Sequence, residues 1–239
     1  MKEFTQDWYD FEYFADPKGK RFVRSNGSVE YWGYRSPTGE ISGGKKIVEA
    51  WKIMFAPKTM LAVGCGRGAI VAYAREADIE AYGFDWSKYA IGDKGRFKKC
   101  KSEWLKCHDA TKPWPYSDKS FDLVVALDLW EHIYEEDLDF TISEMFRVSK
   151  KWCFLEIATV DGVKEKGYIL KKGKPIPLAE DGRTWAGHVT VDTEDFWENR
   201  FDYEDWVLRR DMVSLFYSLL IPATIPNWLL NTVIVLERD

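Results

Sequence analysis

A glycine-rich turn and a distant carboxylate are the residues of this sequence best suited to hold a cofactor. Gly64, Gly66 and Gly68 directly follow the apolar run 60–63, and Asp85 ends a second apolar run after a gap of helix length. This pattern is typical of nucleotide-like cofactor sites, because glycines admit close backbone approach and the following helix presents free N–H groups. Asp85 then stands where a ribose presents its hydroxyl groups.

The spacing of the turn fits two classes of cofactor. Gly64, Gly66 and Ala69 match the dinucleotide pattern of nicotinamide-dependent oxidoreductases, for which Asp85 is also suitable. Gly64, Gly66 and Gly68 match a tighter turn of alternating glycines. The turn alone therefore leaves an NAD-dependent oxidoreductase open beside other nucleotide-binding enzymes.

Two further carboxylates follow predicted strands. Asp109 comes after a short strand-like segment, and Asp128 directly follows the almost continuously apolar run 121–127, which is typical of a strand buried on both faces. Ligands of open α/β sheets bind at the carboxyl ends of the strands, so we expect both carboxylates to share one crevice with Gly64 and Asp85. Asp is also common in turns, and it is the joint occurrence that indicates a site.

Strand and helix patterns alternate through the middle of the chain. Strands are predicted at 60–63, 81–84, 104–107, 121–127, 152–157, 206–208 and 232–236, and helices at 45–56, 67–77, 87–93, 131–148, 193–201 and 213–220. This alternation predicts an α/β fold, in which helices cover both faces of a parallel sheet through right-handed crossovers.

The flanking segments predict the domain organisation. Residues 1–42 are rich in aromatic side chains but lack a clear period, so we expect an irregular N-terminal cap. Residues 43–239 are expected to form the α/β domain, with a loop insertion around 159–190 that is rich in Gly, Lys and Pro. A connection this long is uncommon and is a candidate wall or lid for a binding site.

The charge balance disfavours nucleic acid as a partner. The chain has 39 acidic and 34 basic residues in 239, a net charge of −5, so it gives no strong nucleic-acid signal. Five lysines between 164 and 174 form a local basic stretch. A solvent-exposed face explains such a stretch more often than an anion site, although recruitment of an acidic or phosphorylated acceptor stays open.

Cysteine usage and the N-terminal composition indicate a reducing compartment. Four cysteines do not suggest a disulfide framework, and charged and aromatic residues stand where a signal peptide would, so we expect a cytoplasmic protein. Cys100, Cys107 and His108 lack a usual zinc spacing, and no metal is expected. The oligomeric state is not predicted.

The uncharged run 212–236 is long enough to raise the question of a membrane span. Pro222 and Pro226 lie inside it and favour a helix, a turn and a final strand instead. We therefore expect no transmembrane span.

Four segments carry a family resemblance in combination, namely 61–68, 81–91, 108–133 and 144–150. Together they resemble the class I S-adenosylmethionine-dependent methyltransferases, and specifically a type 11-like bacterial and phage branch whose acceptors are mostly unassigned. The resemblance implies S-adenosyl-L-methionine as the cofactor. It also implies a Rossmann-like doubly wound sheet of about seven strands, mostly parallel with an antiparallel C-terminal strand.

The resemblance further implies a cofactor contact for each of several residues. These are Gly64, Cys65 and Gly66 along the methionine part, Asp85 on the ribose hydroxyls, Trp86 on the adenine face, Asp109 on the exocyclic amine, the Ala110 N–H on a ring nitrogen, Asp128 and Leu129 near the sulfonium, and Tyr31 or Arg35 at the amino-acid end. Ala62 stands where the family usually has an acidic residue that steadies the glycine loop. Either binding is weaker or another group compensates, and a noncatalytic binding protein with this fold stays open.

Catalysis would need few protein groups. Methyl transfer from a sulfonium is an in-line displacement that depends on positioning, and a base is needed only when the nucleophile carries a proton. His188 is the candidate base, because an imidazole pKa of about 6.5 suits that role, although it equally fits a packing role in its loop. His132 and Glu131 are expected to be structural at the start of a helix, with Glu131 near its positive end and substrate contact by Glu131 as the alternative.

The acceptor is the least constrained feature. The segment Asp128-Leu129-Trp130 stands where methyltransferases acting on amino groups of DNA bases carry an Asn/Asp-Pro-Pro-aromatic sequence. An acidic chain with an aromatic cap and a long loop suits a small-molecule or glycan acceptor with a hydroxyl or amine nucleophile.

Overall fold

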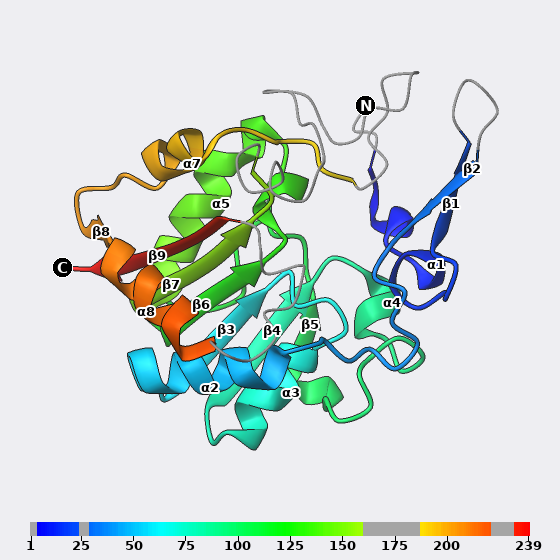
Figure 1. The fold of residues 1–239 in the computed structure, drawn as a ribbon, viewed down its shortest axis with the longest axis horizontal. Helices are drawn as coiled ribbons and strands as arrows, with labels where there is room; N and C mark the ends of the chain where they lie inside the picture. Colours follow the sequence, from blue (N-terminus) through cyan, green and yellow to red (C-terminus); the bar gives the residue numbers. More distant parts are fainter. Residues whose placement is uncertain (1–3, 24–28, 160–186, 221–231) are drawn as a thin grey trace.

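The computed structural model describes residues 4–23, 29–159, 187–220 and 232–239. Its centre is a seven-stranded sheet (Figure 1) made of β3 (Thr59–Val63), β4 (Glu80–Asp85), β5 (Leu105–Cys107), β6 (Phe121–Leu127), β7 (Ser149–Ile157), β8 (Trp206–Leu208) and β9 (Thr232–Arg238). The helices are α2 (Gly44–Phe55), α3 (Ala69–Glu76), α4 (Lys88–Ile91), α5 (Glu135–Val148), α7 (Glu194–Arg200) and α8 (Arg210–Leu220). The predicted α/β alternation is confirmed.

The strand order places a topological switch in the middle of the sheet. The order is β5-β4-β3-β6-β7-β9-β8; β5, β4, β3, β6 and β7 are parallel to one another, and β9 is antiparallel to both β7 and β8. The chain runs outward from β3 to β5 and then returns to β6 on the other side of β3. Because crossovers leave in opposite directions from this point, a crevice forms at the carboxyl ends of β3 and β6. The Rossmann-like fold with an antiparallel C-terminal strand is confirmed.

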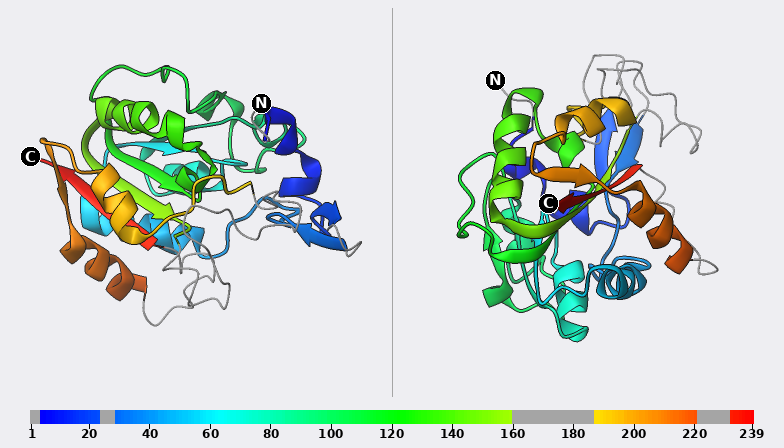
Figure 2. Two further views of the ribbon diagram at one scale, coloured as in Figure 1. Left: turned by 90° about the horizontal axis from the view of Figure 1, so that it is seen from above. Right: turned by 90° about the vertical axis from the view of Figure 1, so that its left-hand side faces the viewer.

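Two apolar layers hold the helices against the sheet. Trp51 of α2, Phe154 of β7 and Phe216 of α8 are fully buried in one layer, which also contains α3. Trp197 of α7 packs in the other layer, together with α5. In the right-hand view of Figure 2, α5 lies on one side of the sheet and α2 and α8 lie on the other.

The N-terminal region contains regular elements that the sequence pattern did not predict. It has a 3₁₀ turn η1 (Gln6–Trp8), a short helix α1 (Phe11–Phe14) and an antiparallel hairpin of β1 (Lys20–Val23) with β2 (Val29–Trp32). Figure 1 shows the hairpin apart from the sheet, with β1 in contact with α1. The expectation of a wholly irregular cap was wrong, because elements of four residues are too short to display a period.

The helix predicted over 131–148 is broken in the structure. Residues Trp130–His132 form a separate 3₁₀ turn, η3, and Ile133 is extended before α5 begins. The Ile133 carbonyl accepts a hydrogen bond of 2.7 Å from Thr190 Oγ1, a contact between distant parts of the chain. This break fixes the orientation of the residues that follow β6.

Several expectations fall outside the described residues. Residues 160–186, which hold most of the expected insertion and the basic stretch 164–174, are outside them, as are Pro222 and Pro226. The flanking helix and strand of the uncharged run are present as α8 and β9. Among the helices within the described ranges, none has the length and apolar character needed to cross a bilayer.

Replacement of Phe154 tests the apolar layer between the sheet and α2. Phe154 is fully buried and its ring lies 5.1 Å from that of Trp51 and 4.7 Å from that of Phe216. Phe154→Ala should reduce the free energy of unfolding by about 3–5 kcal/mol. For a chain of this size, that corresponds to a melting temperature lower by roughly 6–20 °C.

The matched control is Phe140→Ala, since Phe140 on α5 is 41% exposed. Its effect should stay within about 0.5 kcal/mol. Thermal unfolding followed by circular dichroism measures both variants, and equal melting temperatures for the two would contradict the assigned packing.

Candidate functional site

The glycine turn between β3 and α3 lies tightly against its neighbours. Gly64 has a φ of +62°, and a Cβ added there would come 2.8 Å from Cδ1 of Leu129. The Cys65 N–H donates to the Phe84 carbonyl at 3.0 Å, which ties the turn to β4. A residue other than glycine would be strained at this φ and would press on the Leu129 side chain.

Asp85 joins this turn to the end of β4. Its Oδ2 accepts a hydrogen bond of 2.8 Å from the Gly66 N–H, and its Oδ1 accepts one of 2.7 Å from the Ser87 N–H. Each carboxylate oxygen has two lone-pair sites, so further donors can still be accepted. Burial raises the pKa of Asp85 to about 6, and the two N–H bonds oppose that shift.

Ala62 is buried in the apolar layer that contains α2 and α3. It lies opposite Gly83 of β4 and Val125 of β6 in the sheet. The glycine turn nevertheless has a carboxylate partner, because Asp85 accepts the Gly66 N–H.

The residues after β4 and β5 lie next to Asp85. The His108 N–H donates to the Asp85 carbonyl at 3.0 Å and so connects the ends of the two strands. Asp109 Oδ1 accepts from the Thr111 N–H at 2.9 Å and from Thr111 Oγ1 at 2.8 Å, which holds the carboxylate in place. Ala110 is buried directly after it.

Trp86 contacts the N-terminal region. Its carbonyl accepts a hydrogen bond of 2.7 Å from Gln6 Nε2, and its ring centroid lies 6.3 Å from that of Tyr9. The Tyr9 carbonyl in turn accepts a hydrogen bond from the Ser87 hydroxyl. The N-terminal cap therefore lies over the end of β4.

Asp128 follows β6 in a left-handed conformation with a φ of +50°, which is uncommon for a residue other than glycine. Its N–H donates to the carbonyl of Glu156 at 3.0 Å and to the side chain of Glu156 at 3.1 Å. Such strained positions cluster at functional sites. Asp128 is thereby held at the strand end beside Leu129, which touches the glycine turn.

Glu131 lies in η3 rather than at the positive end of α5, so the predicted dipole role is wrong. Its side chain is fully buried, and Oε1 accepts from the Ala158 N–H at 3.3 Å. Burial and the adjacent Asp128 carboxylate raise its pKa well above the usual range. The Glu131 carbonyl accepts from the N–H groups of Val189 and Thr190 at 2.7 and 3.0 Å, which anchors the segment that carries His188.

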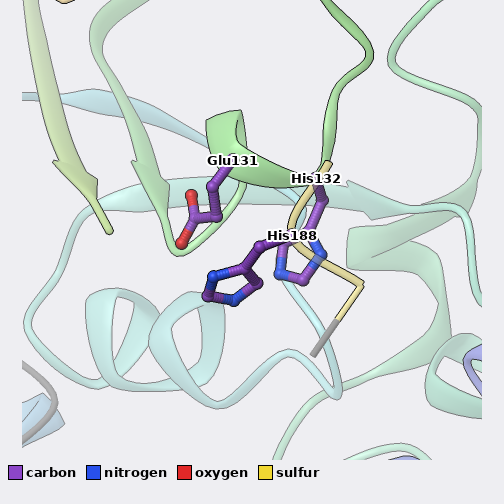
Figure 3. Close-up of side chains that lie close together, drawn as sticks. All are labelled: Glu131, His132 and His188. Atoms are coloured by element: carbon purple, nitrogen blue, oxygen red, sulfur yellow. The ribbon is translucent and has the colours of Figure 1, made fainter. Parts of the chain in front are cut away.

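Two histidines meet beside Glu131 (Figure 3). The rings of His132 and His188 are 4.7 Å apart between centroids and nearly perpendicular. His132 Nδ1 lies 2.9 Å from the Gly187 carbonyl and 3.3 Å from the Tyr9 hydroxyl, as expected for a histidine that bonds to backbone. Burial lowers the pKa of His132 to about 4, so its ring is neutral at physiological pH.

The structure thus brings most of the predicted site residues to one edge of the sheet. Gly64, Cys65, Gly66, Asp85, Trp86, Asp109, Ala110 and Asp128 lie at the adjacent ends of β3, β4, β5 and β6, and His188 joins them from a distant segment. Tyr31 lies on β2 opposite Arg21, and its side chain is outside the described residues. Gln6 and Tyr9 were missed, since nothing in the spacing of the cap indicated them.

Comparison with known proteins identifies the domain. Residues 61–155 match the family model described as a methyltransferase domain. No curated protein matches the chain.

Proteins whose solved structures share this fold are described with different reactions. The plantazolicin methyltransferase BpumL in complex with SAH is 14% identical with a TM-score of 0.57, and the match covers 82% of each chain. A protein from the conversion of a disulfide bond into a thioacetal group in echinomycin biosynthesis is 16% identical, with a TM-score of 0.55 and coverage of 94% of this chain and 87% of that one. The [4+2]-cyclase SpnF is 17% identical, with a TM-score of 0.50 and coverage of 82% and 81%.

The matched residues include the glycine turn, Asp85, Asp109 and the whole of β6, all placed around the switch point of the sheet. This combination distinguishes the domain from a nicotinamide-dependent oxidoreductase, which shares only the turn and the first carboxylate. Residues 61–155 therefore match a methyltransferase domain, and the chain has the fold of class I methyltransferases.

Proposed function

We propose that this protein transfers a methyl group from S-adenosylmethionine to a hydroxyl or amine of a small-molecule or sugar-like acceptor. One observation carries the proposal: Asp85 is bonded to Gly66 of the glycine turn, with Asp109 on one side and the Asp128–His132 segment on the other. A cofactor held along the first two strand ends would direct its sulfonium toward the third. The acceptor would then approach from the side of His188.

On the cofactor side, each assignment follows from position. Asp85 accepts the ribose hydroxyls with its remaining lone pairs, and Asp109 accepts the adenine amine. Trp86, half-buried at the end of β4, packs on the adenine ring. Gly64 to Gly66 border the methionine part, where small residues permit contact with the backbone.

We also propose that Tyr31 contacts the amino-acid end of the cofactor and that Asp128 lies near its sulfonium. The positive φ of Asp128 directs the chain so that Leu129 reaches the glycine turn. A carboxylate at that point favours the positively charged sulfur of the methyl donor.

On the acceptor side, His188 receives the proton of the nucleophile. As the acceptor oxygen or nitrogen forms its bond to the methyl carbon, the carbon–sulfur bond breaks and its electron pair remains on sulfur, giving S-adenosylhomocysteine. The proton leaves for the imidazole. Positioning supplies most of the rate, since sulfur leaves without protonation.

The chemistry of the chain favours a small acceptor over nucleic acid. The net charge is −5, and the aromatic rings of Tyr9 and Trp86 border the site from the cap and from β4. BpumL is described as a plantazolicin methyltransferase, and one of its structures contains a monoazolic desmethylPZN analog with SAH. All four cysteines are free, which agrees with the cytoplasmic location that we propose.

Asp85→Asn should weaken S-adenosylmethionine binding about 10–100-fold at neutral pH, because hydrogen bonds to a charged group contribute about 1.5–3 kcal/mol. The wild-type dissociation constant should rise as the pH falls below about 6, since protonation removes an acceptor that the ribose needs. The rise approaches tenfold per pH unit.

Isothermal titration calorimetry across this pH range measures both effects. Asp202→Asn, at an exposed position, is the matched control and should bind as the wild type does. Unaltered affinity in Asp85→Asn, together with an unaltered pH profile, would remove Asp85 from the cofactor site.

His188→Ala should lower turnover at least about 100-fold while leaving the affinity for S-adenosylmethionine unchanged, because general-base catalysis contributes about 10²–10⁴-fold. An assay of S-adenosylhomocysteine formation against a panel of small-molecule and glycan acceptors measures turnover. Titration calorimetry on the same samples reports cofactor binding and therefore folding. Wild-type turnover in the variant would exclude His188 from the reaction.

A further inference from the structure

We propose that Glu131, His132 and His188 bind a divalent metal ion of the zinc class on the acceptor side of the site. The inference deepens the proposed function and rests on it for the position of the acceptor. It departs from the sequence-based expectation of no metal, which considered only Cys100, Cys107 and His108.

The donor atoms form a compact set. One carboxylate oxygen of Glu131 and one ring nitrogen from each histidine all lie within 4.8 Å of one another. Figure 3 shows the Glu131 carboxylate and the two rings converging from η3 and from the segment after Gly187. Two imidazoles and a carboxylate are typical ligands of Zn²⁺ and neighbouring first-row ions, and ligands around one such ion lie about 3.3 Å apart.

Hydrogen bonding prepares His132 to act as a ligand. A carbonyl oxygen only accepts, so the 2.9 Å contact with Gly187 assigns the ring proton to Nδ1 and the lone pair to Nε2. Metal-binding histidines commonly donate their other N–H to a backbone carbonyl in this way. The contact also fixes the position of Gly187, which directly precedes His188 in the chain. The same hydrogen bond therefore helps to position both imidazoles.

The electrostatics around Glu131 favour a cation. Its side chain is 0% exposed, and Oε1 is bonded to the Ala158 N–H. Within the described parts of the chain, Oε2 accepts no hydrogen bond from an N–H or hydroxyl donor, and the Glu131 side chain interacts with that of Asp128. A second carboxylate, that of Asp128, lies beside it. Two adjacent carboxylates in a buried site repel each other unless a proton or a cation lies between them.

The position of the ion narrows the acceptor chemistry. Three protein ligands leave a coordination position for an acceptor atom. A bound hydroxyl loses its proton to water more readily, and its oxygen keeps lone pairs for attack on the methyl group. A bound amine has already given its lone pair to the ion, so this site favours transfer to oxygen. His188 would then act as a ligand, and the ion would promote loss of the acceptor proton in place of the base role assigned above to the imidazole.

Metal binding is tested directly on the full chain. Protein freed of metal with a chelator is titrated with Zn²⁺ by calorimetry and with Co²⁺ by visible absorption. We expect one ion per chain and a Co²⁺ spectrum with nitrogen and oxygen ligation. His188→Ala and His132→Ala should each weaken binding at least about 100-fold, since even loss of a ligand's hydrogen-bond partner costs about 10–100-fold.

The third histidine of the chain, His108, provides the matched control. His108→Ala should bind Zn²⁺ as the wild type does, and circular dichroism should report the same fold for all variants. Absence of stoichiometric binding, or equal losses in all three variants, would overturn the metal site.

Two separate readouts distinguish failure of this inference from failure of the proposed function. S-Adenosylmethionine binding is measured on the metal-free protein, where it should persist. Absence of binding in both the metal-loaded and the metal-free protein would contradict the proposed function but not the metal site. Full turnover by the metal-free protein would overturn the role of the ion and leave His188 as the base.

Discussion

The hydrogen bond between the Gly66 N–H and the Asp85 carboxylate, 2.8 Å long, is the contact on which the site depends. It joins the turn after β3 to the end of β4, and Gly64 then sets the distance to the segment after β6 through its contact with Leu129. A parallel sheet brings strand ends together but does not fix their loops. This bond fixes the turn with a group that we propose also accepts hydrogen bonds from the cofactor, so support and binding would reside in one side chain.

The N-terminal cap and the segment after Gly187 complete the site from opposite ends of the sequence. Tyr9 reaches both sides, because its carbonyl accepts from Ser87 near Asp85 and its hydroxyl lies 3.3 Å from His132 Nδ1. These segments lie over a sheet edge that is shared by proteins with different reactions, including a methyltransferase and a cyclase. In the proposed function, the sheet would position the donor and the covering segments would determine what reacts with it.

Local sequence patterns predicted the fold and the strand-end positions of the candidate site residues. The strand 121–127 and the positions of Asp85 and Asp109 were evident, because periodicity and strand-end location are properties of neighbouring residues. The break at Ile133 was not, since it depends on a hydrogen bond from Thr190. The meeting of His188 with Glu131 was missed for the same reason. Both contacts come from tertiary structure, and the roles assigned to Glu131 and His132 from helix position alone were accordingly incomplete.

The central claim is that the glycine turn and its carboxylates select a sulfonium cofactor over a dinucleotide. Titration calorimetry of the wild-type protein with S-adenosylmethionine and, separately, with NAD⁺ tests it most directly. The account predicts saturable binding of one S-adenosylmethionine per chain and no measurable heat of binding with NAD⁺. Binding of NAD⁺ without binding of S-adenosylmethionine would contradict it.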